Sequence, residues 1–273
     1  MNTSIWYCYA VARSFPDGAE LAELAGIHGA AVHTITHGDL VAVLSPVSAD
    51  EFGEAGLSAR LEDLDWLEDV ARSHNAVVNW VAQRSATLPF RLGTIYLDQP
   101  RVREVLATEE HRLAAALDRV AGRQEWGLKV YTDPEEQTPG ANAPAADDGA
   151  GDMRPGQSYL RRRKAARQAR EVGWQEALRH STEIDRALSE LADNRRQHRP
   201  QSQELSGSAG QNVLNVAYLV TSENSDIFVA RARKLEECAV ACSIELTGPW
   251  APYSFAVEDL VAAEDEEPAT EPR

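Results

Sequence analysis

The stretch from residue 133 to residue 156 is the feature that most constrains the fold. It is rich in Pro, Gly, Ala, Asp and Glu and carries no hydrophobic stripe. Such a segment cannot bury enough apolar surface to offset its ordering entropy, so we expect a flexible linker. A chain of 273 residues normally forms about two domains. We therefore predict one domain at residues 1–132 and another at residues 157–257, followed by an acidic disordered tail at residues 258–273.

The first domain alternates between β-strand and helix patterns. Its β-rich runs change to a helical hydrophobic period at Leu57 and change back near Thr87. The predicted elements are strands at 5–12, 31–36, 40–44, 87–96 and 127–132 and helices at 17–25, 57–84 and 98–122. The first six follow the order β-α-β-β-α-β, which is typical of the ferredoxin-like sandwich. We expect an antiparallel sheet with helices on one face, to which the last helix and strand are an addition.

The second domain is predicted to be a smaller α/β domain. A long helix from Tyr159 to about Arg196 is followed by a strand at 213–221 and a helix from Asp226. Two last strands, at 243–246 and 253–257, are separated by a Pro-containing loop. This order corresponds to a long helix followed in the chain by half of a ferredoxin-like fold. The overall fold class is thus α+β (α/β) with two domains.

Charge and cysteine content restrict the environment and the partners. The net charge is −16, which would repel a phosphate backbone, so no nucleic-acid partner is expected. The three cysteines are too few for a disulfide framework and fit a reducing compartment. No apolar run is long enough to span a bilayer, and the first residues do not resemble a secretory signal. We expect a cytoplasmic protein with no membrane partner.

Histidines offer no convincing chemical site. His28, His33 and His37 could contribute to a metal site, but no cysteine ligand lies beside them, and ordinary hairpin histidines are favoured. His74 lies on the apolar stripe of its helix without a nucleophile elbow nearby, which favours a core or interface histidine over a triad member.

Charged clusters also have a simpler explanation than catalysis. Acidic residues from Glu62 to Asp69 could pair for acid–base work or bind Mg²⁺, but they also match the solvated face of an amphipathic helix. The basic run from Arg161 to Arg170 lacks the interleaved aromatics of an RNA-binding arm, so pairing with acidic groups is favoured. The glycines match no phosphate-binding loop. We therefore expect no catalytic residue, no metal site and no cofactor.

Two segments are unusual. The first runs from Leu88 to Tyr96 and places Arg91 in an apolar strand. Arg91 either lies on the solvent-exposed face of this strand or is positioned to pair with a carboxylate at a surface. The second runs from Gly248 to Phe255, where two prolines stiffen a loop that presents Trp250 and Tyr253. These aromatic rings either fill the core or anchor a partner.

These segments also carry a resemblance to a known family. The chain resembles the GvpL/GvpF family of gas vesicle proteins over nearly its whole length except the linker and the tail. Two motifs recur in the family: a Pro-x-Arg-Phe-Gly-Thr strand and a Gly-Pro-Trp-Pro-Pro-Tyr-x-Phe segment. This chain departs from them at Leu92, where Phe is common, and at Ala251, where Pro is common. The matching segments are residues 64–67, 74–75, 89–94, 126–131, 159–163 and 248–255.

The resemblance implies an accessory or minor structural protein in gas vesicle assembly, located in the cytoplasm and associated with the vesicle. Its implied partners are the small hydrophobic shell protein GvpA and other Gvp proteins, and it implies no enzyme activity. The alternative is a small-molecule-binding enzyme or sensor on a ferredoxin-like fold, with Arg91 and His74 in a cleft. The expected partner-binding residues are Phe90, Arg91, Thr94, Trp250, Tyr253 and Phe255. We expect the first three to lie in the first domain and the last three in the second.

Overall fold

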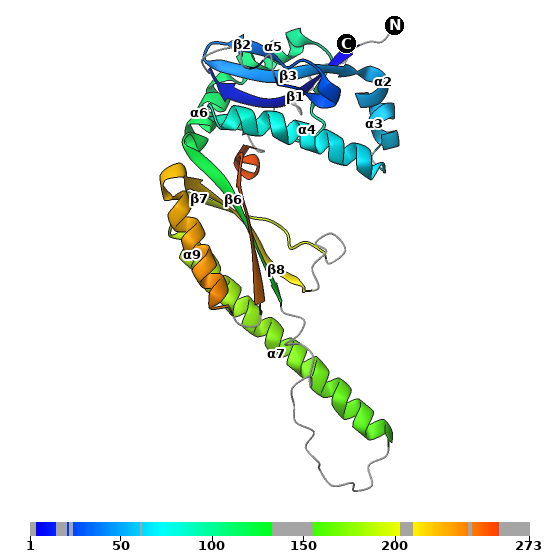
Figure 1. The fold of residues 1–273 in the computed structure, drawn as a ribbon, viewed down its shortest axis with the longest axis vertical. Helices are drawn as coiled ribbons and strands as arrows, with labels where there is room; N and C mark the ends of the chain where they lie inside the picture. The colour runs from blue at the N-terminus through cyan, green and yellow to red at the C-terminus, as the bar shows by residue number, and fades with distance from the viewer. Residues whose placement is uncertain are drawn as a thin grey trace, which may run out of the picture. The chain divides into compact units, whose positions relative to one another are not determined.

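The computed structural model describes residues 4–14, 21, 24–60, 62–132, 155–202, 210–239 and 242–256. They form two compact units, drawn in Figure 1. Unit 1 comprises Met1–Glu125 together with Pro249–Arg273, and unit 2 comprises Trp126–Gly248. The chain therefore leaves the first unit and returns to it, instead of dividing once at residue 132. The predicted tail and most of the predicted linker lie outside the described residues.

The sheet of unit 1 is antiparallel, as predicted for a ferredoxin-like sandwich. Its order is β2-β3-β1-β4, and the short β5 also pairs with β1. The pairs β1–β3, β1–β4 and β2–β3 are all antiparallel. The strands are β1 (Ser4–Arg13), β2 (His33–His37), β3 (Leu40–Ser48), β4 (Thr87–Pro89) and β5 (Ile95–Tyr96). The mixed α and β fold class is thus confirmed.

Helices cover both faces of this sheet, not one as expected. Ala12 packs in the core cluster that includes Val77 of α4. Val11, whose side chain points to the opposite face because successive strand residues alternate, lines a pocket with Leu106 of α5 and Leu113 of α6. The added helix of the sequence prediction therefore covers the second face. The helices are α2 (Ala49–Phe52), α3 (Glu54–Arg60), α4 (Leu64–Ala82), α5 (Gln99–Thr108) and α6 (Glu110–Val120).

Helix boundaries follow local capping. Asp63 accepts a hydrogen bond from the Trp66 backbone N–H at 3.1 Å, which starts α4 and divides the single predicted helix at 57–84. Asp98 caps α5 in the same way, as predicted, and the predicted helix at 98–122 breaks at Glu109. The predicted helix at 17–25 lies mostly outside the described residues, although Leu21 is buried.

Unit 2 is a complete second β-α-β-β-α-β unit, not a half. Its sheet has the order β7-β8-β6-β9, which repeats the order of unit 1. The strand predicted to close the first domain, β6, is the first strand here, because it lies between β8 and β9. The elements are β6 (Arg123–Thr132), α7 (Pro155–Ser189), β7 (Asn194–Gln197), β8 (Asn212–Thr221), α9 (Ser225–Glu237) and β9 (Cys242–Trp250), with short 3-10 turns at Ile27–Gly29 and Ser222–Asn224.

Three sequence predictions for the second half need correction. The helix α7 begins at Pro155, inside the predicted linker, and ends at Ser189. β7, with the sequence Asn-Arg-Arg-Gln, was not predicted because it has no apolar alternation. The last predicted strand, 253–257, is instead a helical turn at residues 253–256. The Phe255 backbone N–H donates to the Pro252 carbonyl at 3.1 Å, which closes this turn.

Apolar contacts hold each unit around its own core. Unit 2 buries Tyr218 of β8 and Phe228 of α9, whose ring centroids lie 5.4 Å apart. Trp126 of β6 joins them and donates its indole N–H to Ser225 Oγ at 2.9 Å. In the part of the chain that the structure describes, no helix is long and apolar enough to cross a membrane.

A candidate interaction site around His74

Tyr7 and His74 form the buried centre of the site. Tyr7 comes from β1 and His74 from α4, and the Tyr7 hydroxyl lies 3.0 Å from His74 Nδ1. The Gly93 backbone N–H donates to the Tyr7 oxygen at 3.1 Å. That oxygen can donate its own O–H to Nδ1 or accept a second hydrogen bond from it, depending on the tautomer of His74. One phenol thus ties the 91–94 turn to α4.

Burial keeps this centre uncharged at neutral pH. Loss of hydration lowers the pKa of His74 to about 4, against a smaller opposing effect of the Phe90 backbone carbonyl. The same loss of hydration raises the pKa of Tyr7. His74 Nε2 has no hydrogen-bond partner among the described residues. The pair is therefore a poor acid–base couple near pH 7, and its geometry is that of a structural hub.

Residues 251–256, here called the closing segment, are fixed onto this hub. The ring of Tyr253 lies 6.1 Å from the His74 ring, and its hydroxyl donates to Asn75 Oδ1 at 2.9 Å. The backbone N–H and the hydroxyl of Ser254 each donate to the Glu125 carboxylate at 2.7 Å. Burial, followed by the nearby Glu125 charge, raises the pKa of Tyr253. A buried carboxylate that accepts two hydrogen bonds is a strong anchor for this segment.

Arg91 lies in a tight turn, which corrects its placement in a continuous strand. The backbone N–H and the hydroxyl of Thr94 both donate to the Arg91 carbonyl, at 3.2 and 2.9 Å. Gly93 adopts a φ of 83°, which favours glycine and separates β4 from β5. The Arg91 side chain is exposed, and no carboxylate lies within ion-pair distance of it among the described residues. Its proposed pairing partner is thus not found within this part of the chain.

The six predicted partner-binding residues divide by exposure. Phe90 and Phe255 are buried, and Thr94 and Tyr253 are half-buried. Arg91 is exposed, and Trp250 is 46% exposed. Only the last two offer a substantial free surface, and the other four support them.

All six predicted partner-binding residues lie in unit 1, which corrects the expectation that each domain would carry one segment. Tyr7 contacts Gly93 in the first segment, and His74 contacts Tyr253 in the second, so the hub joins them. The sequence prediction missed Tyr7 and Glu125 as site residues. The position of His74 on an apolar helix stripe was the one available signal, and its burial confirms the interpretation as a core histidine.

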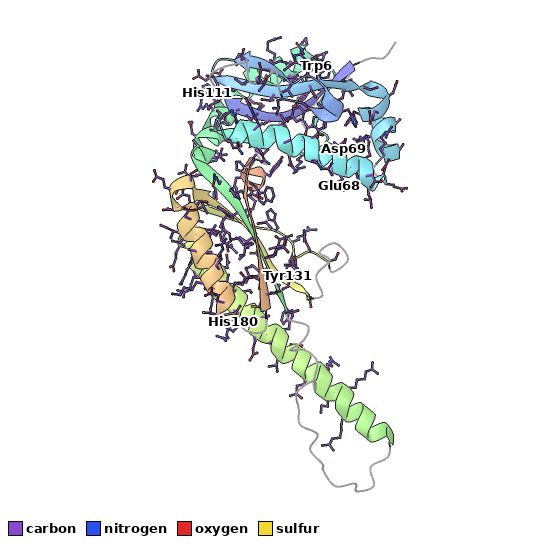
Figure 2. All side chains as sticks on the ribbon, in the orientation of Figure 1. Trp6, Glu68, Asp69, His111, Tyr131 and His180 are labelled. Carbon is purple, nitrogen blue, oxygen red and sulfur yellow. The ribbon has the colours of Figure 1, made fainter. Side chains whose placement is uncertain are left out.

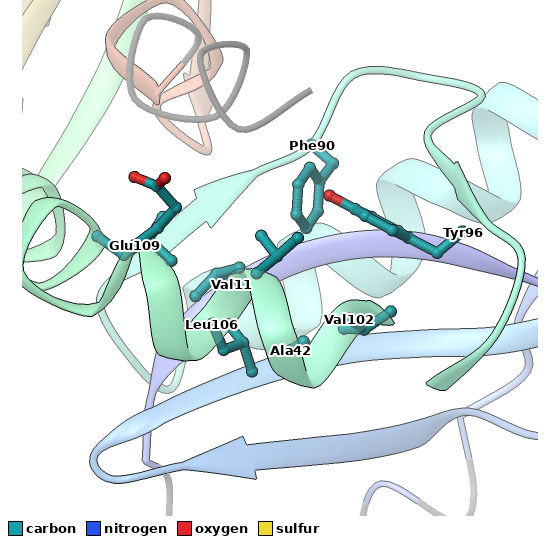
Figure 3. Close-up of a pocket in the computed structure, with 9 residues that line it drawn as sticks. Val11, Ala42, Phe90, Tyr96, Val102, Leu106 and Glu109 are labelled. Atoms are coloured by element: carbon teal, nitrogen blue, oxygen red, sulfur yellow. The ribbon is translucent and has the colours of Figure 1, made fainter. Parts of the chain in front are cut away.

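A small pocket beside Phe90 offers no reactive groups. Figure 3 shows it between β1 and α5, with Phe90 and Tyr96 at one side and Glu109 at the other. Glu109 is its one charged lining residue and pairs with Arg112 at 2.7 Å. The described residues contain no group of three or more His, Cys, Asp or Glu side chains that could hold a metal ion. Arg91 and His74 do not share this pocket, so the geometry does not favour the enzyme or sensor alternative.

Comparisons with known proteins agree on one family. Residues 5–257 match the family of gas vesicle synthesis proteins GvpL/GvpF. Gas vesicle protein L of Streptomyces sp. (strain CB03234) is 44% identical over 92% of both chains, and gas vesicle protein F of Haloferax mediterranei is 24% identical over 85% of both.

Solved structures share the fold. The crystal structure of the gas vesicle protein GvpF from Anabaena sp. PCC7120 superposes with a TM-score of 0.65 at 18% identity, over 93% of this chain and 96% of that one. GvpF from Microcystis aeruginosa gives a TM-score of 0.62 at 17% identity, over 92% and 98%. Since the family match spans both units and the hub between its motif segments, this chain belongs to the GvpL/GvpF family of gas vesicle proteins.

Proposed function

We propose that this protein is an assembly factor or minor structural component that binds the gas vesicle shell protein GvpA and other Gvp proteins. Membership of a gas vesicle family supports a role in vesicle formation. The observation that carries the docking proposal is the hub itself. It fixes two motif segments in place, and each leaves an exposed side chain next to a rigid anchor.

The proposed docking surface consists of Arg91, Leu92 and Trp250. Leu92 is 45% exposed and Trp250 is 46% exposed, so each offers apolar surface to a partner. Arg91 adds a guanidinium with free donors for a carboxylate. Trp and Arg are the residue types that dominate binding energy at interfaces. The fixed backbone of the turn lowers the entropy lost on binding.

A protein that binds a hydrophobic shell subunit before assembly must also keep the complex in solution. The net charge of −16 opposes non-specific association of the loaded complex. On this proposal the protein acts in the cytoplasm and at the vesicle, and it acts by binding and not by catalysis.

Co-purification with GvpA tests the proposal. Tagged wild-type protein should retain GvpA, whereas the double variant Arg91→Glu with Trp250→Ala should lose it by at least tenfold, the effect of about 1.4 kcal/mol. Leu64→Asp, at another exposed apolar residue in the same unit, is the matched control and should retain GvpA. If wild-type protein retains no GvpA, or if the control loses as much as the double variant, the proposed surface is wrong.

A further inference from the structure

The N-terminal part of α7 carries a basic face that no described residue covers. From Arg161 to Arg170 the sequence has six basic residues and no acidic residue. Every side chain described between Arg161 and Val172 is exposed, and burial begins at Gly173. Figure 1 shows this part of the helix extending beyond the sheet of unit 2. The described part of unit 2 therefore does not explain these charges.

Three exposed cations define the basic face: Arg163, Lys164 and Arg167. At about 3.6 residues per turn they fall within an arc of about 100°, and they span about 6 Å along the axis. Like charges four residues apart destabilise a helix, so Arg163 and Arg167 act against its formation. Ala165 and Ala166 lie between them and favour the helix without adding charge. Clustered like charges that destabilise their own helix suggest that this face binds an anionic surface.

A matching acidic face lies on α4 of unit 1. Asp65, Glu68 and Asp69 are exposed and share one side of the helix at the same spacing of one turn. Figure 2 labels Glu68 and Asp69 on this helix, where their side chains are 71% and 54% exposed. Arg72 reaches both carboxylates, which offsets one of the three charges. A net negative face therefore remains, similar in length to the basic face.

We propose that the basic face of α7 binds the acidic face of α4 on a second copy of this chain. Each copy carries both faces, so the contact is head-to-tail and can add further copies. The two faces are opposite in sign and alike in spacing, with three positive charges on one and a net of two negative charges on the other. This association uses neither Arg91 nor Trp250, so it stands or fails independently of GvpA binding.

Sedimentation velocity of the full chain tests this self-association. At low ionic strength the weight-average mass of the wild type should rise with protein concentration. At about 0.3 M salt the association constant should fall at least about tenfold, because screening then acts within about 6 Å. The variant R163E/K164E/R167E should stay monomeric throughout.

Helix α9 supplies a matched control. Arg231, Arg233 and Lys234 are exposed on it and comprise the same residue types. The variant R231E/R233E/K234E changes the net charge by the same amount and should associate like the wild type. Equal losses in both triple variants would overturn the proposal, since they would show a general charge effect.

A charge exchange identifies the partner face. The variant D65K/E68K should be monomeric alone, and mixing it with R163E/K164E/R167E should restore a complex. Absence of concentration-dependent association in the wild type, or failure of the mixed pair to associate, would overturn the proposal. The proposal would also be overturned if R163E/K164E/R167E lost the binding of a DNA duplex probe but still self-associated like the wild type.

Discussion

Acidification should destabilise unit 1 through His74. Burial holds the pKa of this imidazole at about 4 in the folded protein, against 6.5 ordinarily. Between these two values the unfolded chain binds a proton that the folded protein does not. The free energy of unfolding therefore falls as the pH falls through this window, and His74 has no such effect above about pH 6.5.

The expected magnitude follows from the difference between the two pKa values. A difference of about 2.5 corresponds to about 3 kcal/mol, most of which is lost by about pH 4.5. That is a large share of the stability of a typical domain. Protonation would also place a cation between the rings of Tyr7 and Tyr253.

Urea unfolding at about pH 7 and about pH 4.5 measures this loss, with His74→Gln as the test variant. Glutamine can still accept the Tyr7 hydrogen bond but does not titrate. The variant should lose about 2–3 kcal/mol less than the wild type between the two pH values. The exposed His111 supplies the control His111→Gln, which should behave like the wild type. Equal losses in wild type and His74→Gln would refute the reasoning.

Three further substitutions test the anchors of the fold. Glu125→Gln weakens both hydrogen bonds from Ser254 and should cost about 1–3 kcal/mol, with faster amide exchange at residues 253–256; unchanged exchange would contradict the anchoring role. Gly93→Ala should cost about 1–2 kcal/mol in urea unfolding, because its φ of 83° is strained for alanine while nothing lies within 4 Å of the added Cβ. Gly210→Ala should cost more than Gly93→Ala, because its Cβ would lie 1.9 Å from the Thr132 carbonyl oxygen, and the opposite ranking would count against this packing.

Local patterns predicted much of the fold. The β-α-β-β-α-β order of the first unit follows from changes between the strand and helix periods, and the Asp98 cap marks the start of α5. Burial of His74 follows from its place on an apolar helix stripe. Each of these depends on interactions between neighbours in the chain, which is why sequence alone could reveal them.

Contacts between segments far apart in the chain were not predicted from the sequence. Nothing local to β6 shows that it pairs with β8 and β9 across most of the second half of the chain. The return of the closing segment to unit 1 depends on Glu125, whose role appears only when Ser254 is placed beside it. The turn at Arg91 was hidden because Gly93 also fits a strand pattern until its φ is known.

Vesicle formation in cells tests the central proposal most directly. In a strain that lacks this gene, the wild-type chain should restore gas vesicles. The variant Arg91→Glu with Trp250→Ala should not restore them, although it should accumulate in soluble form to the wild-type level, because both side chains are exposed. Full restoration of gas vesicles by this variant would contradict the account.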